Sequence, residues 1–260
     1  MNKKKIMPFW EHIEELRIRM IRCLFVIIIM MFFLMINKKI LFNQIIFGPA
    51  KKNFITYRLL KHFTNKLYFH NLSIQNREIF GQFNIYIWIC FCGGFILSFP
   101  YIFYELWSFI SPAFSDKERI YSQIITTMVS TLFCIGMFFG YFILFPFLIN
   151  FGYTFKISNF PKNIFDLSDY ISLIINSVLL MGMIFLFPFF IFLLSKAGLI
   201  SYSFLRKYRK HAFLIMLIIS SAITPGDILS TIIVLIPLLI LYQFSIFISF
   251  YIFKKKNHLK

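Results

Sequence analysis

The chain has 260 residues, of which 59% are hydrophobic, 14% are charged and 38 are phenylalanine. This composition excludes an ordinary soluble domain, which is about half apolar and about a quarter charged. The net charge of +17 does not indicate a nucleic-acid partner either, because the basic residues lie between long apolar stretches and are spread over several loops.

The first predicted element is an amphipathic helix over Phe9–Met20 that lies along the inner membrane surface and leads into the first span. Apolar residues recur at positions 9, 13, 16 and 20, which is helical spacing, and the other face carries three carboxylates and three arginines, counting Arg22. Two interpretations are open. The charges form intrahelical ion pairs on a surface helix, such as Glu15 with Arg19, or they form a polar docking face for a cationic ligand.

Apolar stretches separated by charged segments predict an all-α integral membrane protein, in one domain over residues 1–260, with six transmembrane helices. The predicted spans are 22–37, 83–105, 121–149, 169–195, 211–223 and 228–253. An even number of spans places both termini on one side. The segments on that side carry more Lys and Arg than the other loops, which predicts cytoplasmic termini.

Two segments of the chain depart from simple spans. The loop 38–82 mixes apolar and basic residues, which predicts helices lying at the outer membrane surface. The fifth span is short for a bilayer of ~30 Å. Either the bilayer thins around it, or the helix borrows residues from the basic segment Tyr202–His211, whose long side chains can snorkel.

The predicted cytoplasmic turn from Trp107 to Arg119 is rich in aromatic residues for a loop. Its carboxylates Asp116 and Glu118 are suited to bidentate hydrogen bonds with arginine. Equally, Pro112 ends one helix and the next begins with a capping box that includes Glu118, and both interpretations can hold together.

The apolar spans hold almost no ionisable residue, and we expect Glu105 and His211 near span ends to be interfacial. This argues against a proton-coupled transporter or pump. Gly93-Gly94 and the pair Gly136 and Gly140 predict close helix packing. Proline within four spans predicts kinks, at Pro100, Pro146, Pro188 and Pro237. We find no enzyme signature, and expect no cofactor or metal and no role for the four cysteines beyond packing.

Ordered motifs across nearly the whole chain resemble the TatC family of twin-arginine, Sec-independent, protein translocase subunits. The motifs are His12-x-x-Glu15-Leu16-Arg17, Ser98-x-Pro100, Trp107-x-Phe109-Ile110-x-Pro112-Ala113, Glu118-Arg119, Ile135-Gly136-Met137, Tyr141-Phe142, Phe145-Pro146, Asp169-Tyr170-Ile171-Ser172, Thr224-Pro225-x-Asp227 and Ile236-Pro237. The loop 38–82 matches least, apart from Gly48-Pro49.

The resemblance implies a non-enzymatic core subunit of the translocase in the bacterial inner membrane, with six kinked helices forming a concave cup. It implies that twin-arginine signal peptides of folded precursors bind at the cytoplasmic face and that the proton motive force drives export. The signal-peptide contacts it implies are Glu15, Arg17, Phe109 and Glu118. The implied partners are single-span TatA- or TatB-type subunits, other copies of the chain and the lipid bilayer.

The resemblance also implies structural or partner-contact positions, namely Pro49, Pro112, Thr231, Asp227 and Gln243. One position departs from the family pattern: Leu186 stands two residues before a proline, where members often carry a polar residue that holds the partner. Packing, or Thr231 and Gln243, would then have to hold the partner. The alternative function is a small-solute channel or secondary transporter, which requires polar residues around a midplane cavity or broken helices with inverted symmetry.

Overall fold

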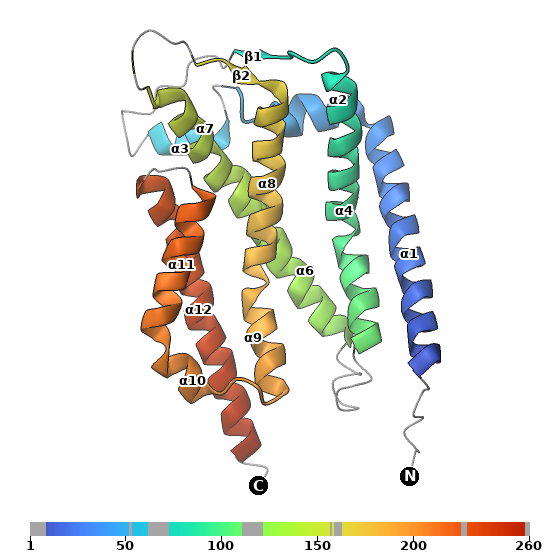
Figure 1. The fold of residues 1–260 in the computed structure, drawn as a ribbon, viewed down its shortest axis with the longest axis vertical. Helices are drawn as coiled ribbons and strands as arrows, with labels where there is room; N and C mark the ends of the chain where they lie inside the picture. Colours follow the sequence, from blue (N-terminus) through green and yellow to red (C-terminus); the bar gives the residue numbers. More distant parts are fainter. Residues whose placement is uncertain are drawn as a thin grey trace. The chain divides into compact units, whose positions relative to one another are not determined.

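The computed structural model describes residues 9–51, 54–61, 73–110, 122–156, 158, 163–224 and 228–257, and these are mostly helical (Figure 1). The elements in chain order are α1 (Phe9–Ile36), α2 (Lys38–Ile40), the π-helical turn η1 (Leu41–Ile46), α3 (Ile55–Lys61), β1 (Ile74–Gln75), α4 (Gly81–Ile110), α6 (Ser122–Phe139), the π-helical turn η3 (Gly140–Leu144), α7 (Phe145–Thr154), β2 (Phe165–Asp166), α8 (Leu167–Phe185), α9 (Phe187–Lys196), α10 (Tyr202–Lys207), α11 (Arg209–Ile223) and α12 (Ile228–Asn257).

Five segments of the described chain are long and apolar enough to cross a membrane. They are Trp10–Ile36, Gly81–Ile110, Gln123–Thr154, Leu167–Lys196 and Ser230–Tyr251. Each overlaps one of the predicted spans, and the fifth predicted span, 211–223, is not among them. The helix there, α11, has 15 residues, or about 22 Å at ~1.5 Å per residue. It takes in Arg209–His211 but not the rest of the basic segment, which forms the separate helix α10.

Helix α1 runs unbroken from Phe9 to Ile36. The amphipathic segment is therefore the first three turns of the helix that continues as the first span, not a separate element before it. The physical reason is that α1 contains no proline or glycine, so nothing interrupts the main-chain hydrogen bonds between its charged and apolar parts.

The contacts divide the chain into two compact units. Unit 1 comprises Met1–Ile45 and Glu78–Thr131, and unit 2 comprises Ile46–Arg77 and Leu132–Lys260. In unit 1, α1 and α4 lie side by side (Figure 1). A Cβ atom built on Gly94 of α4 would lie 3.0 Å from the Ile27 carbonyl oxygen of α1, which confirms the predicted close packing there. Near one end of the pair, the Tyr86 hydroxyl donates to the Met35 carbonyl at 2.9 Å.

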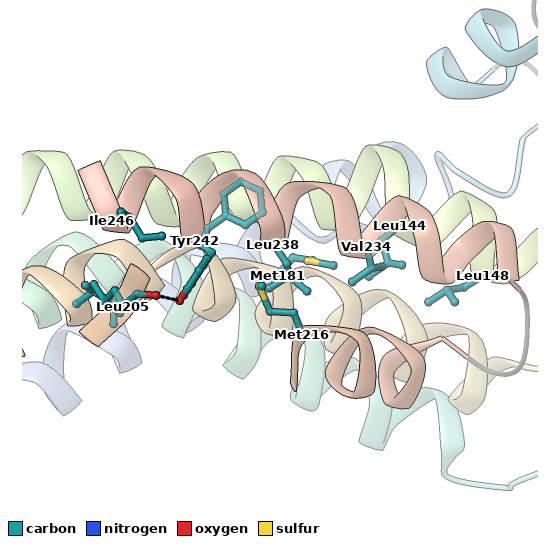
Figure 2. Packing of buried hydrophobic residues seen from close by; sticks show 11 residues of the cluster. Leu144, Leu148, Met181, Leu205, Met216, Val234, Leu238, Tyr242 and Ile246 are labelled. Carbon is teal, nitrogen blue, oxygen red and sulfur yellow. Dashed lines mark hydrogen bonds between the residues drawn. The ribbon is translucent and has the colours of Figure 1, made fainter. Parts of the chain in front are cut away.

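Unit 2 is built around one cluster of buried apolar side chains from α7–α12 and η3 (Figure 2). Its labelled members are Leu144, Leu148, Met181, Leu205, Met216, Val234, Leu238, Tyr242 and Ile246. The Tyr242 hydroxyl donates to the Leu205 carbonyl at 2.8 Å, which joins α12 to α10. Lipid is as apolar as these side chains, so tight packing and such hydrogen bonds carry more of the stability than in a soluble core.

Glycine brings α6 and η3 against α8 in unit 2. A Cβ atom on Gly136 would lie 2.5 Å from the Met181 carbonyl oxygen, and one on Gly140 would lie 2.5 Å from the Ser177 carbonyl oxygen. The two backbones are therefore too close for any larger residue at either glycine, as the spacing of the glycines predicted.

The four prolines of the spans have two different surroundings. Pro100 and Pro237 lie inside continuous helices, α4 and α12. Pro146 and Pro188 instead stand in the first turn of α7 and α9, directly after the η3 turn and after a non-helical residue at Leu186. Pro146 has no N–H to donate to the Phe142 carbonyl one turn earlier, and the Thr56 hydroxyl of α3 donates to that carbonyl instead.

The segment between α1 and α4 was predicted to be helical, and the described part of it contains α2, η1 and α3. It also contains one feature that the all-α prediction missed. Strand β1 pairs in parallel with β2, with Ile74 opposite Phe165 and Gln75 opposite Asp166. Two residues per strand give too short a pattern for recognition in sequence.

Candidate functional site

A cluster of charged side chains in unit 1 joins the beginning of α1 to the end of α4. The two residues of this helix that the family resemblance singled out have different surroundings. The Arg17 guanidinium donates to the Glu14 carboxylate at 3.1 Å, and both side chains are mostly exposed, so the pair is a solvated surface ion pair of small energetic weight. Glu15 is only 32% exposed, so its interactions are better shielded from water.

Arg19 joins α1 to α4 by binding two carboxylates at once. Its Nε and Nη2 atoms donate to Oε1 of Glu15 at 3.0 and 2.6 Å. Its Nη1 atom donates to Oε2 of Glu105 at 2.8 Å. A planar guanidinium has a fixed set of donor directions, so two acceptors on different helices fix the plane of the group.

Glu105 is the buried member of this cluster, with 5% of its surface exposed. The Tyr101 hydroxyl donates to its Oε1 atom at 2.9 Å, and the Arg22 guanidinium lies 3.8 Å from the same oxygen. We expected Glu105 to be interfacial, and it is buried within unit 1 because two arginines of α1 and one tyrosine of its own helix surround the carboxylate. A buried carboxylate requires such partners.

Phe109, one turn after Glu105, stacks on His12 near the start of α1. The ring centroids lie 4.2 Å apart and the ring planes differ by 16°. Stacked aromatic pairs add about 0.5–1.5 kcal/mol beyond their buried area. The last turn of α4 and the first turns of α1 are therefore held together by a ring stack next to the charged cluster.

Two hollows flank Arg19 within unit 1. One, of about 520 Å³, is lined by Glu11, Glu14, Glu15, Ile18, Arg19 and Arg22. The other, of about 260 Å³, is almost entirely apolar and is lined by residues of α1 and α4 that include Leu16, Leu106 and Phe109, with Arg19 and Glu105 at its polar edge. An acidic hollow next to an apolar one suits a ligand with a cationic and an apolar part.

Of the four predicted peptide contacts, Glu15, Arg17 and Phe109 lie at this end of unit 1. Arg17 points to Glu14 and not to the cluster. Glu118, like Pro112 in the same turn, lies outside the described residues. The sequence reasoning missed the joint role of Arg19 and Glu105. The available signal was that Glu105 is the single charged residue in the 30 residues of α4, whereas arginines stand at Arg19 and Arg22.

Three of the predicted structural and partner-contact residues, Pro49, Thr231 and Gln243, are described and belong to unit 2. Pro49 is fully buried, and its carbonyl accepts a hydrogen bond from the Tyr57 hydroxyl at 2.7 Å, where burial raises the pKa of Tyr57 above its usual range. Thr231 lies 2.7 Å from Thr224, oxygen to oxygen. Gln243 is exposed on α12, and Asp227 lies outside the described residues.

Leu186, the departure from the family pattern, is 7% exposed and forms the turn between α8 and α9. It is part of the interior of unit 2. Among the described residues, no three His, Cys, Asp or Glu side chains gather as a metal site.

Comparison with known proteins identifies relatives along nearly the full length of the chain. The family described as Sec-independent protein translocase protein (TatC) matches residues 11–237. The TatC protein of Blattabacterium sp. subsp. Periplaneta americana (strain BPLAN) is 65% identical over 264 residues, which cover 98% of this chain and 99% of the relative. TatCd of Bacillus subtilis (strain 168) is 30% identical over 245 residues, with 94% and 92% covered.

Solved structures of TatC have a similar fold. A crystal structure of the twin-arginine translocase receptor TatC superposes with a TM-score of 0.69 at 27% identity and covers 93% of this chain and 99% of the receptor chain. The receptor's structure in DDM gives a TM-score of 0.71 at 28% identity, with 92% and 99% covered.

Proposed function

The chain belongs to the TatC family of Sec-independent protein translocase proteins, and on that premise we propose that it is the receptor for twin-arginine signal peptides in its translocase. Like its relatives it is a membrane protein and a component of a protein transport system, not an enzyme. The solute channel considered from the sequence is not retained, because the family is a protein translocase family.

The observation that carries the proposal is the exposed acidic hollow at the start of α1. Glu11, Glu14 and Glu15 line it together with Arg19 and Arg22, and of these carboxylates Glu14 is paired with Arg17 and Glu15 with Arg19. Paired arginines present planar, charged donors, and carboxylates held on a helix are their natural acceptors. The neighbouring apolar hollow beside Phe109 would receive the apolar residues of the peptide.

We propose Glu15, Arg17, Phe109 and Glu118 as the peptide contacts. Membranes containing the chain would be exposed to a signal peptide that carries a photo-crosslinker, with its two arginines intact or replaced by lysines. We expect the wild type to capture the arginine peptide and not the lysine peptide. We expect the Glu15→Gln and Glu118→Gln variants to lose capture of the arginine peptide. Glutamine keeps the shape of the side chain, so it removes the charge without opening a cavity.

Glu78→Gln is the matched control for this experiment. Glu78 is an exposed carboxylate of the same unit, three residues before α4 begins and so at the opposite end of α4 from Glu105. It should leave capture unchanged. Equal capture of arginine and lysine peptides by the wild type would overturn the receptor proposal, whereas loss in Glu15→Gln with no loss in Glu118→Gln would remove only Glu118 from the site.

We also propose that α11 is a sixth span, that residues 1–260 act as one TatC-like membrane domain with six spans in a concave cup, and that both termini are cytoplasmic. At about 22 Å, α11 is shorter than the ~30 Å hydrocarbon core, so the bilayer would have to thin beside it. Cysteine accessibility tests the topology: cysteines placed at Ser203, before α11, and at Lys254, near the end of α12, should label from one side of the membrane, and a cysteine at Asn76 from the other. Labelling of the Ser203 and Lys254 positions from opposite sides would show that α11 does not cross and would overturn the six-span arrangement.

For the partners, we propose single-span TatA- or TatB-type subunits and other copies of this chain, with the proton motive force driving export. Gln243 supports partner docking on α12, because it is a polar side chain exposed among apolar residues. An exposed amide within a membrane gains by bonding to a neighbouring helix. Buried Leu186 cannot take this role, since its side chain is apolar and lies in the interior.

A further inference from the structure

Resting on the proposed function, we infer that Arg19 and Glu105 are positioning residues that hold Glu15 in the orientation that selects arginine over lysine in the signal peptide. None of the predicted contacts includes either residue. The inference follows from a chain of hydrogen bonds. It begins at the buried carboxylate of Glu105 on α4, passes through Arg19, and ends at the partly exposed carboxylate of Glu15 on α1.

The anchor is Glu105. Both of its oxygens are engaged, Oε1 by the Tyr101 hydroxyl and Oε2 by Arg19 Nη1, and the side chain is 7% exposed. A carboxylate this buried cannot exchange its partners for water without a large cost. Its position on α4 is therefore fixed, and so is the Nη1 atom that donates to it.

Arg19 passes this constraint to Glu15. With Nη1 fixed on Glu105, the plane of the guanidinium is set, and its Nε and Nη2 atoms hold the Oε1 atom of Glu15 at 3.0 and 2.6 Å. A glutamate on an isolated helix surface would sample several rotamers and would lose that freedom on binding a peptide. Here Arg19 has already removed that rotamer freedom from Glu15 before the peptide binds.

The remaining oxygen of Glu15 is available to a ligand. Both hydrogen bonds from Arg19 end on Oε1, and among the described residues Oε2 accepts none. The Glu15 side chain lines the acidic hollow and is 32% exposed, so Oε2 can be reached from solvent. An oxygen held in one direction favours a donor of matching direction, which an arginine fork provides.

The charge of the cluster accounts for the discrimination against lysine. Arg19 and Arg22 balance the charges of Glu15 and Glu105, and Arg17 pairs with Glu14, so Glu11 is the one carboxylate of the hollow whose charge no ion pair among the described residues offsets, and the attraction for a bare point charge is small. A lysine ammonium binds mainly as a point charge, whereas a guanidinium gains directional hydrogen bonds. Without Arg19, the Glu15 carboxylate would be neither held in one orientation nor neutralised by a neighbouring cation. Binding of the lysine peptide should then strengthen and binding of the arginine peptide should weaken.

The test measures the ratio of crosslinking between the arginine peptide and the lysine peptide, in membranes, for Arg19→Gln, Glu105→Gln and the double variant. Each single variant should lower the ratio by roughly tenfold, the size of one charge-assisted hydrogen bond. Because Glu105 acts through Arg19, the double variant should be no worse than Arg19→Gln alone. Tyr86→Phe is the control, since it removes an α1–α4 hydrogen bond at the other end of the same helix pair.

Several outcomes would overturn the inference. These are an unchanged ratio in both single variants, additive losses in the double variant, or the same fall in Tyr86→Phe. If a glutamine variant does not accumulate in the membrane, Arg19→Lys replaces it: lysine keeps the charge beside Glu105 but cannot hold both carboxylates, and an unchanged ratio there contradicts the inference. Failure of the proposed function is a separate result, in which the wild type itself does not distinguish the peptides.

Discussion

The His12 and Phe109 rings stack face to face although the two residues belong to different helices, at the start of α1 and the end of α4. Phe109 can therefore serve a peptide site in two ways, by contacting the peptide or by holding the first turn of α1 in place. Substitutions on the two sides of the stack separate these roles.

We expect Phe109→Ala to reduce capture of the arginine peptide by a factor of a few up to about tenfold, from the loss of a stack of about 0.5–1.5 kcal/mol together with a peptide contact. His12→Ala removes the same stack but leaves the Phe109 ring in place. If His12→Ala reduces capture as much as Phe109→Ala does, the phenylalanine acts by anchoring α1. Photo-crosslinking yields and amide exchange in the first turns of α1 measure the two effects.

Gly136→Ala should destabilise unit 2 by about 1–3 kcal/mol, the usual cost of overpacking. The added methyl would lie 2.5 Å from the Met181 carbonyl oxygen and 2.9 Å from the Gly182 Cα atom, both main-chain atoms that cannot rotate away. Gly152→Ala is the matched control, because its methyl meets only the Phe165 ring at 3.4 Å. Thermal unfolding in detergent should show a lower midpoint for Gly136→Ala alone, and equal midpoints would contradict the packing described here.

Thr56→Val should cost about 1–3 kcal/mol, because it leaves the Phe142 carbonyl in the turn before Pro146 without the hydroxyl that donates to it. Thr56→Ser keeps the hydroxyl and should stay close to wild type. The readout is again the unfolding midpoint in detergent. Equal midpoints for the valine and serine variants would show that this hydrogen bond carries no stability.

Thr231 and Gln243 should respond differently to loss of polarity. The hydroxyls of Thr224 and Thr231 share a hydrogen bond of 2.7 Å, so Thr231→Val removes one of its partners and should destabilise this contact between the end of α11 and α12. Gln243 is exposed, so Gln243→Leu should leave stability unchanged and reduce co-purification of a single-span partner. Unchanged co-purification in Gln243→Leu would exclude this residue as a docking position.

Replacing both Arg19 and Glu105 by methionine should separate stability from peptide recognition. Breaking a buried ion pair by a single substitution costs about 3–5 kcal/mol, whereas replacing both partners by apolar residues is often neutral. We therefore expect a near wild-type unfolding midpoint together with loss of arginine selectivity. A large fall in the midpoint would mean that the pair serves mainly to hold the two helices together.

The sequence predicted what depends on regular patterns and missed what depends on contacts between distant residues. Long apolar runs located the five described spans, and small residues four apart located the close approach of α6 and η3 to α8. The burial of Glu105 was missed because it depends on Arg19 and Arg22 of another helix. The helical spacing of the charged segment was predicted, but its continuity with the span depends on the absence of a proline or glycine between them.

The site was predictable to the extent that it follows motifs. Glu15 and Phe109 came from the family resemblance, and their role as peptide contacts stays a prediction. Arg17 was assigned the same role, yet its guanidinium points to Glu14. The sequence alone could not distinguish Arg17 from Arg19, since both lie near glutamates at helical spacing, and only the position of α4 decides which of them faces Glu105.

The pairing of α1 with α4 has a mechanical consequence. The two helices are joined at three levels, by Arg19 with Glu105, by the close contact of Gly94 with Ile27, and by Tyr86 with Met35. Two helices that are joined at several points along their length resist bending more than a single helix does. A pulling force applied at the proposed peptide site near Glu15 would therefore be transmitted along the helix pair to the segment after α1, with little bending of either helix.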